Sequence, residues 1–257
     1  MFVFERFYSI VVGALAVFAS IANAGDQTVE RFDNQGASTL HYLLYQPDLD
    51  SQAVAQVRTE DGRIPLLLFL HGGGEGGDNI EKVKMHGPPR LIKEGKDFPF
   101  FVVSPQNPST TQFWDDQSLM ALVDHLVDRY AVDPSRIYLT GMSRGGFGAW
   151  RLAIQNPDRF ACLVPICGGG DPPYVRKIKQ MPIWVFHGQR DDMIPISESE
   201  QMVDALRELG NDVKFTVYPN AKHDAWTETY GNDDLYTWML EQRIAIQPQS
   251  DQTRPAK

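Results

Sequence analysis

Cysteine is nearly absent from this chain of 257 residues, and its scarcity excludes a disulfide framework. The two cysteines, Cys162 and Cys167, belong to one apolar run, with no CxxC or histidine-rich pattern nearby. On one strand they would lie ~16 Å apart and point to opposite faces, whereas a disulfide needs Cα atoms within ~7 Å. We therefore expect two buried free thiols and no metal site.

Basic residues are also in deficit. The 24 lysines and arginines face 33 aspartates and glutamates, so the net charge is −9. So acidic a chain lacks the positive surface that nucleic acid requires, and we expect no nucleic-acid partner. The hydrophobic content of 42% and charged content of 22% exclude disordered, collagenous and coiled-coil classes. The sequence also has no GxxxxGK[ST], which excludes a P-loop.

A long apolar run occurs only near the N-terminus, at residues 10–21, and Ala22-Asn23-Ala24 follows it. This pattern predicts a signal peptide over residues 1–24 and a secreted or periplasmic protein that begins at Gly25. An uncleaved membrane anchor is the alternative, but the run is short for a span of ~20 residues. We expect no stable membrane insertion after cleavage. One domain would cover 25–246, and the polar segment 247–257 would be disordered.

Apolar runs alternate with helical patterns along the rest of the chain. Strands are predicted at 41–45, 66–70, 100–103, 137–139, 163–166, 183–186 and 213–217. Helices are predicted at 119–130, 197–209 and 235–243, with Ser197 and Glu200 as a capping box. Because the strand runs do not alternate with polar residues, they suit a mostly parallel, doubly wound α/β sheet that is buried on both faces.

The segment Gly141-Met142-Ser143-Arg144-Gly145 joins the predicted strand 137–139 to a helical stretch at 147–155. A GxSxG at such a junction is typical of a nucleophile elbow, because the sharp turn needs neighbours without Cβ bulk. The turn would lift the Ser143 hydroxyl above the sheet at a helix N-terminus. The alternative is a glycine-rich helix start with an incidental serine.

A second glycine motif, His71-Gly72-Gly73-Gly74, directly follows the predicted strand 66–70. Backbone amides of such a loop can approach a tetrahedral oxyanion closely, so we expect donors near Gly73 and Gly74. The amide of Arg144, after the serine, would complete the set. A flexible glycine loop is the alternative, and His71 itself is interpreted as structural.

An acid and a base are expected after the serine, in that order. Asp191 and Asp192 both follow the strand 183–186, and spacing alone does not choose between them. His223 follows the strand 213–217, where a general base belongs, although a surface-loop histidine is the alternative. His187 precedes the acid loop and fits the base poorly.

These pieces together resemble the α/β-hydrolase superfamily. Within it the chain is similar to the secreted bacterial carboxylesterase and predicted-peptidase group, related to dienelactone hydrolases, feruloyl esterases and polyhydroxybutyrate depolymerases. The resemblance rests on LLLFLHGGGEGGDN, RIYLTGMSRGGFGAW, WVFHGQRDDMIP and FTVYPNAKHDAW. The HGxxDxx[IV]P pattern of the family places the acid on Asp191. Two residues depart from the family: Arg144 replaces an apolar residue, and Lys222 replaces a glycine.

The resemblance implies an α/β-hydrolase fold with helices on both faces and no large cap domain. It implies a serine hydrolase that cleaves small carboxylic esters through an acyl-enzyme, with Ser143 as nucleophile, His223 as base, Asp191 as acid, and no cofactor or metal. Arg144 would favour acidic substrates. A serine peptidase acting on short peptides, or a non-catalytic binding protein that keeps the fold, are the alternatives.

Overall fold

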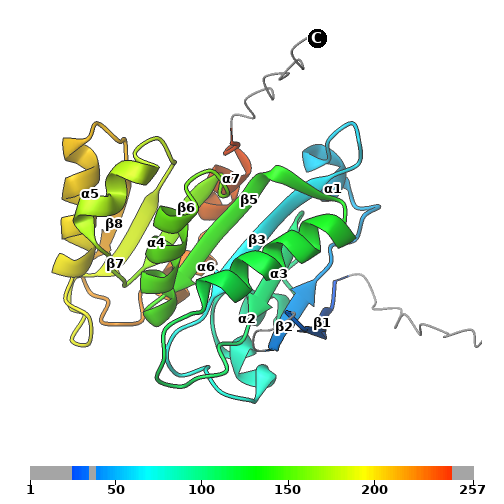
Figure 1. Ribbon diagram of the computed structural model, residues 1–257, viewed down its shortest axis with the longest axis horizontal. Coiled ribbons are helices and arrows are strands. Elements are labelled where there is room, and N and C mark those ends of the chain that lie inside the picture. Colours follow the sequence, from blue (N-terminus) through cyan, green and yellow to red (C-terminus); the bar gives the residue numbers. More distant parts are fainter. Residues whose placement is uncertain (1–24, 35–38, 245–257) are drawn as a thin grey trace, which may run out of the picture.

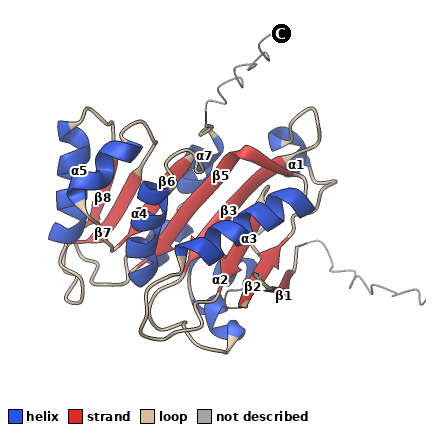
Figure 2. Cartoon of the chain, in the orientation of Figure 1, coloured by secondary structure: helices blue, strands red, loops and turns tan. Residues whose placement is uncertain are grey.

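The centre of the molecule is an eight-stranded sheet with the order β1-β2-β4-β3-β5-β6-β7-β8 (Figures 1 and 2). The computed structural model describes residues 25–34 and 39–244, so the predicted signal peptide 1–24 and the tail 247–257 lie outside the described residues. The strands are β1 Gln27–Phe32, β2 Leu40–Tyr45, β3 Ile64–Leu70, β4 Phe101–Pro105, β5 Val132–Met142, β6 Cys162–Ile166, β7 Trp184–Gly188 and β8 Lys214–Tyr218. The pairs β1–β2 and β2–β4 are antiparallel, and all later pairs are parallel.

Helices cover both faces of this sheet. They are α1 Gln52–Val57, α2 Gly87–Lys93, α3 Asp116–Arg129, α4 Arg144–Gln155, α5 Ser197–Glu208, α6 Trp226–Gly231 and α7 Asp233–Leu240, with 3₁₀ turns η1 Ile80–Met85 and η2 Pro172–Ile178. Helices α3, α4 and α5 pack on one face, in front of the sheet in Figure 1, and α2, α6 and α7 pack on the other. The predicted fold class is therefore confirmed, and no cap domain interrupts the described part of the chain.

Strand β3 shows why the apolar runs lack alternation. All seven of its residues are buried. Leu66, Leu68 and Leu70 enter the core under α3 and α4, whereas Leu67 and Phe69 enter the core on the opposite face. Successive side chains point to opposite faces, so a strand that is covered on both sides must be apolar at every position. None of the helices in the described residues is both long and apolar enough to cross a lipid bilayer.

Two local predictions are wrong. The chain enters α5 through Ile196, which has helical backbone angles and no side-chain cap, so Ser197 already lies in the first turn and forms no capping box. Cys162 and Cys167 are free and buried, as expected. However, they share one core instead of facing opposite sides, because Cys167 lies beyond the end of β6 with a positive φ of 47°.

The pairing of β6 with β7 is much thinner than that of their neighbours. Strands β5 and β6 align five residue pairs, and so do β7 and β8. Between β6 and β7 only Ile166 and Phe186 are aligned as ladder partners, with an isolated bridge from Leu163 to Ile183. The sheet therefore has a sparsely bonded seam between its sixth and seventh strands in chain order.

Candidate active site

Ser143 occupies the turn between β5 and α4, with φ 54° and ψ −121°. Positive φ is strained for a residue with a side chain, and close backbone packing around the turn holds it. A Cβ on Gly145 would lie 2.0 Å from the carbonyl oxygen of Leu70, and one on Gly141 would lie 2.2 Å from that of Gly145. Both motif glycines are therefore required by contact with neighbouring backbone.

The structure brings Ser143, His223 and Asp191 into one hydrogen-bonded row. His223 Nε2 lies 2.9 Å from Ser143 Oγ, and Nδ1 lies 2.8 Å from Asp191 Oδ2. An ionised carboxylate only accepts hydrogen bonds, so Nδ1 donates to it and Nε2 is left to accept the serine hydroxyl. The row has the order of the hydroxyl–imidazole–carboxylate relay that activates a serine.

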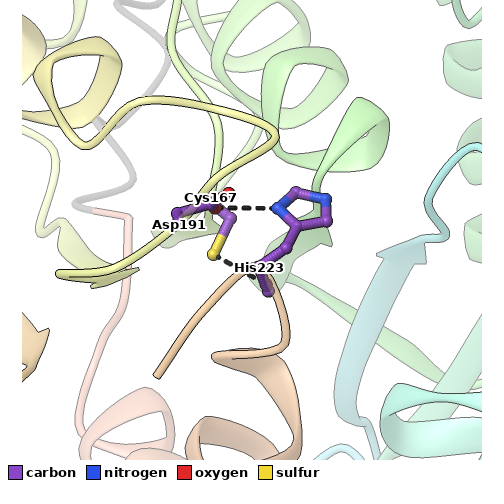
Figure 3. Close-up of side chains that lie close together, drawn as sticks. All are labelled: Cys167, Asp191 and His223. Atoms are coloured by element: carbon purple, nitrogen blue, oxygen red, sulfur yellow. Dashed lines mark hydrogen bonds and ion pairs between the residues drawn. The ribbon is translucent and has the colours of Figure 1, made fainter. Parts of the chain in front are cut away.

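Asp191 and Asp192 have opposite environments. The Asp191 side chain is 0% exposed and faces His223 (Figure 3). The Asp192 side chain is 60% exposed and pairs with Lys222 at 2.8 Å. The structure therefore brings the first of the two adjacent carboxylates to the histidine. Lys222, one of the two departures from the family pattern, is bound on the surface by the second.

The Asp191 carboxylate is held from several directions. Its Oδ1 accepts the amides of Met193 and Ile194, both at 2.9 Å. Burial alone raises the pKa of Asp191, but the hydrogen bonds from His223 and from these two amides outweigh it, and the net pKa is lowered. The carboxylate is thus kept ionised and fixed in direction.

His187 contacts the same carboxylate from within the fold. It is fully buried, and its Nε2 lies 3.2 Å from Asp191 Oδ2 and 3.0 Å from the carbonyl of Ile194. Burial lowers its pKa, so the ring is neutral. Both neighbours of Nε2 are acceptors, which places a ring proton there, and Nδ1 lies 2.8 Å from the Ser199 hydroxyl, which itself donates to the carbonyl oxygen of Gly168 at 2.8 Å. His187 is thus a buried neighbour of the acid.

Cys167 is a third neighbour of this group, which the sequence did not suggest. Its Sγ donates to the carbonyl oxygen of His223 at 3.3 Å (Figure 3). Burial raises the pKa of the thiol to about 12, with the charge of Asp191 adding to the rise. Within residues 25–34 and 39–244, Cys167, Asp191 and His223 form the one group of three or more potential metal ligands whose ligand atoms all lie within 4.8 Å of one another. The thiol is protonated and the other two atoms bond each other, so hydrogen bonding accounts for their closeness.

The loop from His71 to Glu75 lies directly against the serine. A Cβ on Gly72 would be 3.5 Å from Cβ of Ser143, whereas Cβ atoms on Gly73 and Gly74 would meet nothing within 4 Å. A side chain at either of the two predicted oxyanion donors would thus enter open space. The amide of Arg144 is the first of α4, where helix amides have no intrahelical partner.

The Arg144 side chain binds neighbouring loops. Its Nη1 donates to Thr110 O at 2.8 Å, and Nη2 donates to Ser109 O at 3.2 Å and to Gly72 O at 3.4 Å. Burial lowers the pKa of the guanidinium. Backbone carbonyls thus hold its terminal nitrogens while the guanidinium keeps its charge, and the expectation that Arg144 favours acidic substrates stays a prediction.

A cavity of about 480 Å³ runs along α4 and begins one helical turn beyond Ser143. Aromatic rings of Phe113, Phe147 and Tyr174 line it together with Arg151. The neighbouring Trp114 is only 4% exposed and packs in the core. The described residues therefore offer a largely apolar cavity along α4, the helix that follows the serine.

Comparison with known proteins places these residues in a family context. The model of the family described as "Dienelactone hydrolase family" matches residues 106–236, which include Ser143, Asp191 and His223. The bifunctional acetylxylan esterase/xylanase of Neocallimastix patriciarum is 28% identical over 185 residues, which are 68% of this chain and 26% of that protein. The acylamino-acid-releasing enzyme of Arabidopsis thaliana is 28% identical over 151 residues, which are 42% of this chain and 20% of that enzyme. The chain thus spans about a quarter or less of these curated relatives.

Solved structures agree on the architecture. A thermostable esterase is 30% identical, with a TM-score of 0.70, over 85% of this chain and 63% of that one. A ferulic acid esterase is 16% identical, with a TM-score of 0.60, over 84% of this chain and 96% of that one. The second likeness concerns the fold alone, because the identity is low.

Proposed function

Because the chain belongs to the dienelactone hydrolase family of α/β-hydrolases, we propose that it is a serine hydrolase that cleaves carboxylic esters through an acyl-enzyme. The observation that carries the proposal is the row of Ser143, His223 and Asp191, with contacts of 2.9 and 2.8 Å at a strained elbow. Relatives named as esterases support the reaction class.

The reaction follows from the proton positions. Ser143 Oγ attacks the acyl carbon while His223 Nε2 takes its proton, and Asp191 stabilises the imidazolium that forms. The amides of Gly73, Gly74 and Arg144 bind the oxyanion, a role worth ~3–4 kcal/mol per donor in related enzymes. His223 then protonates the leaving alcohol. In the second half, the same nitrogen takes a proton from water, which attacks the acyl carbon. That proton then passes to Ser143 Oγ as its bond to the acyl group breaks, so that the carboxylic acid and free Ser143 are released.

A peptidase is the second candidate, because relatives include the acylamino-acid-releasing enzyme of Arabidopsis thaliana. Both reactions would use the same serine, but an amine leaving group needs stronger general-acid help. A panel of p-nitrophenyl acyl esters, feruloyl esters and acylaminoacyl amides separates the two. We expect turnover of the esters to exceed that of the amides, and the reverse order would favour the peptidase.

The decisive variant is Ser143→Ala, with Ser197→Ala as the matched control on α5, where the serine caps nothing. We expect the first to abolish ester hydrolysis and labelling by a fluorophosphonate, and the second to retain both. Near wild-type turnover in Ser143→Ala would refute the assignment. An unlabelled wild-type serine would instead favour a non-catalytic binding protein.

We also propose that the chain is exported and that Gly25 becomes the first residue. The support is the apolar run that ends in Ala22-Asn23-Ala24. Intact-mass measurement of the exported protein tests this, because retention of Met1 would contradict cleavage.

A further inference from the structure

Gly72, the residue that packs against Ser143, is held on both sides by buried ionisable side chains that the proposed reaction does not use. Glu75 is 5% exposed, and its Oε2 would lie 3.3 Å from a Cβ on Gly72. On the other side, the Gly72 carbonyl oxygen accepts from His71 Nδ1 at 2.7 Å and from Arg144 Nη2 at 3.4 Å. Three side chains thus act on one glycine.

The Glu75 carboxylate lies beside Gly72 and faces both His71 and Arg144. Burial raises the pKa of its carboxyl overall, and His86, the amides of Glu75 and Gly72, and Arg144 oppose the rise. The groups that face the carboxylate are His71 Nδ1 at 3.8 Å, His86 Nε2 at 3.6 Å and, at longer range, the Arg144 guanidinium. Burying a carboxylate whose charge is not fully compensated costs free energy. Its presence in the loop that contacts Ser143 therefore indicates that it has a function there.

His71 is a fixed donor on the carbonyl side. Its Nε2 accepts the amide of Asn107 at 3.0 Å, so the proton of the neutral ring lies on Nδ1 and is donated to Gly72. Burial lowers the pKa of His71 to about 4, and the ring therefore keeps this tautomer at neutral pH. Arg144 adds a charged donor to the same oxygen.

The donors to the Gly72 carbonyl also orient the N–H of Gly73, which belongs to the same peptide group. In a planar trans peptide the carbonyl of one residue and the N–H of the following residue point in opposite directions. Holding the Gly72 carbonyl toward His71 and Arg144 therefore fixes the direction of the Gly73 amide. Without those donors, two flanking glycines would let this peptide rotate easily.

We propose that His71 and Arg144 are positioning residues that lock the Gly72–Gly73 peptide so that the Gly73 amide serves as an oxyanion donor, and that the Glu75 carboxylate, which faces both of them, holds their side chains in place. This inference rests on the proposed esterase function. It assigns to Arg144, the departure from the family pattern, the work of orienting a backbone group. None of the three side chains needs to touch the substrate.

The first test compares Glu75→Gln, Glu75→Ala and Arg144→Met on one activated ester. We expect kcat to fall about 10- to 100-fold in Glu75→Ala and Arg144→Met, with KM changed less than about threefold. This loss is smaller than the 10²–10³ that follows removal of an oxyanion donor, because the Gly73 amide is loosened and not removed. Glu75→Gln should lie between Glu75→Ala and the wild type, because it keeps the size and polarity of the side chain beside Gly72 and removes only its charge. Glu81→Gln is the control: its side chain is 59% exposed and pairs with Lys84.

The second test measures the hydrogen bonds that the oxyanion donors make to the carbonyl oxygen of the acyl-enzyme. Oxyanion donors lower the infrared stretching frequency of the acyl-enzyme carbonyl, so this band should shift upward in Arg144→Met and Glu75→Ala and stay in place in Glu81→Gln. If Glu75→Ala fails to fold, Arg144→Met carries the same comparison. Unchanged kcat and an unchanged band in folded variants would overturn the lock.

Failure of the proposed esterase function would give a different result from failure of the lock on the Gly72–Gly73 peptide. Fluorophosphonate labelling of Ser143 also passes through an oxyanion-like state, so its rate can be measured without any ester substrate. An inactive wild type that is still labelled would refute the esterase, and slower labelling in Arg144→Met would then still support the lock. An active wild type with equal labelling rates in all variants would refute the lock alone.

Discussion

Replacing Asp191 by asparagine should disable the relay by changing the tautomer of His223. The Oδ1 atom of Asp191 accepts two amides, from Met193 and Ile194 at 2.9 Å, so an asparagine oxygen must take that position. Its NH₂ group then occupies the place of Oδ2, 2.8 Å from His223 Nδ1. A donor there forces Nδ1 to accept, which moves the ring proton to Nε2. The nitrogen that should receive the proton of Ser143 is then already protonated.

The expected loss is large because His223 can no longer accept the proton of Ser143. A tautomer change of this kind typically lowers kcat by about 10⁴, which corresponds to about 5.4 kcal/mol at 1.36 kcal/mol per tenfold. Asp192→Asn is the matched control, since it removes only an exposed pair with Lys222, and such pairs contribute little. We expect its kcat to stay within about twofold of the wild type.

The assay is kcat on one p-nitrophenyl ester, with circular dichroism to confirm that both variants fold. A loss below about tenfold in Asp191→Asn would refute the tautomer argument. Greater damage from Asp192→Asn would place the acid one residue later. Small and equal losses in both variants would mean that the acid comes from another part of the chain.

Two further predictions concern the scaffold. Gly145→Ala should give no soluble protein or lower Tm by about 10 °C, because its Cβ would lie 2.0 Å from the Leu70 carbonyl oxygen; a variant with unchanged Tm would contradict this packing. The buried Asp133 carboxylate pairs with Arg136, with 2.7 Å between Oδ2 and Nε. Burial raises the pKa of Asp133, but hydrogen bonds from Ser135 and Arg136 outweigh burial, so the net pKa is lowered. This stability is present above the unfolded pKa of about 3.9 and is lost as pH falls through the lower folded value. Urea unfolding should therefore show Asp133→Asn to be less stable than the wild type by about 3 kcal/mol at pH 7, and this gap should shrink progressively as the pH falls below about 3.9. A gap independent of pH would count against the argument.

The fold was predictable where its causes are local. The apolar residues of β3 indicate a strand buried on both faces, and the glycines around Ser143 indicate a turn that only small neighbours permit. The position of His223 followed from the order of strands along the chain. The α5 start was not predictable from Ser197 and Glu200, because the preceding residue Ile196 already adopts helical angles.

The surroundings of the site could not be predicted from the sequence. Spacing alone left Asp191 and Asp192 equal, and only the family pattern preferred the one that lies at His223 in the structure. The contact of Cys167 with His223 depends on a positive φ after β6, which an apolar run does not reveal. The approach of Glu75 to Gly72 likewise arises because one loop folds back on itself. These contacts are set by tertiary packing rather than by local pattern.

The short pairing between β6 and β7 lies between the strand that precedes Ser143 and the strands that precede Asp191 and His223. Ser143 follows β5 on one side of this seam, whereas Asp191 and His223 follow β7 and β8 on the other. Proteins open in cooperative units of unequal stability, and a joint with one aligned ladder pair is a natural boundary between two such units. If the last two strands detach, imidazole and hydroxyl separate while most of the secondary structure persists. Hydrolysis would then stop at a lower denaturant concentration than the one at which the far-ultraviolet signal disappears, and enzyme activity would serve as a gauge of how firmly the last two strands are docked.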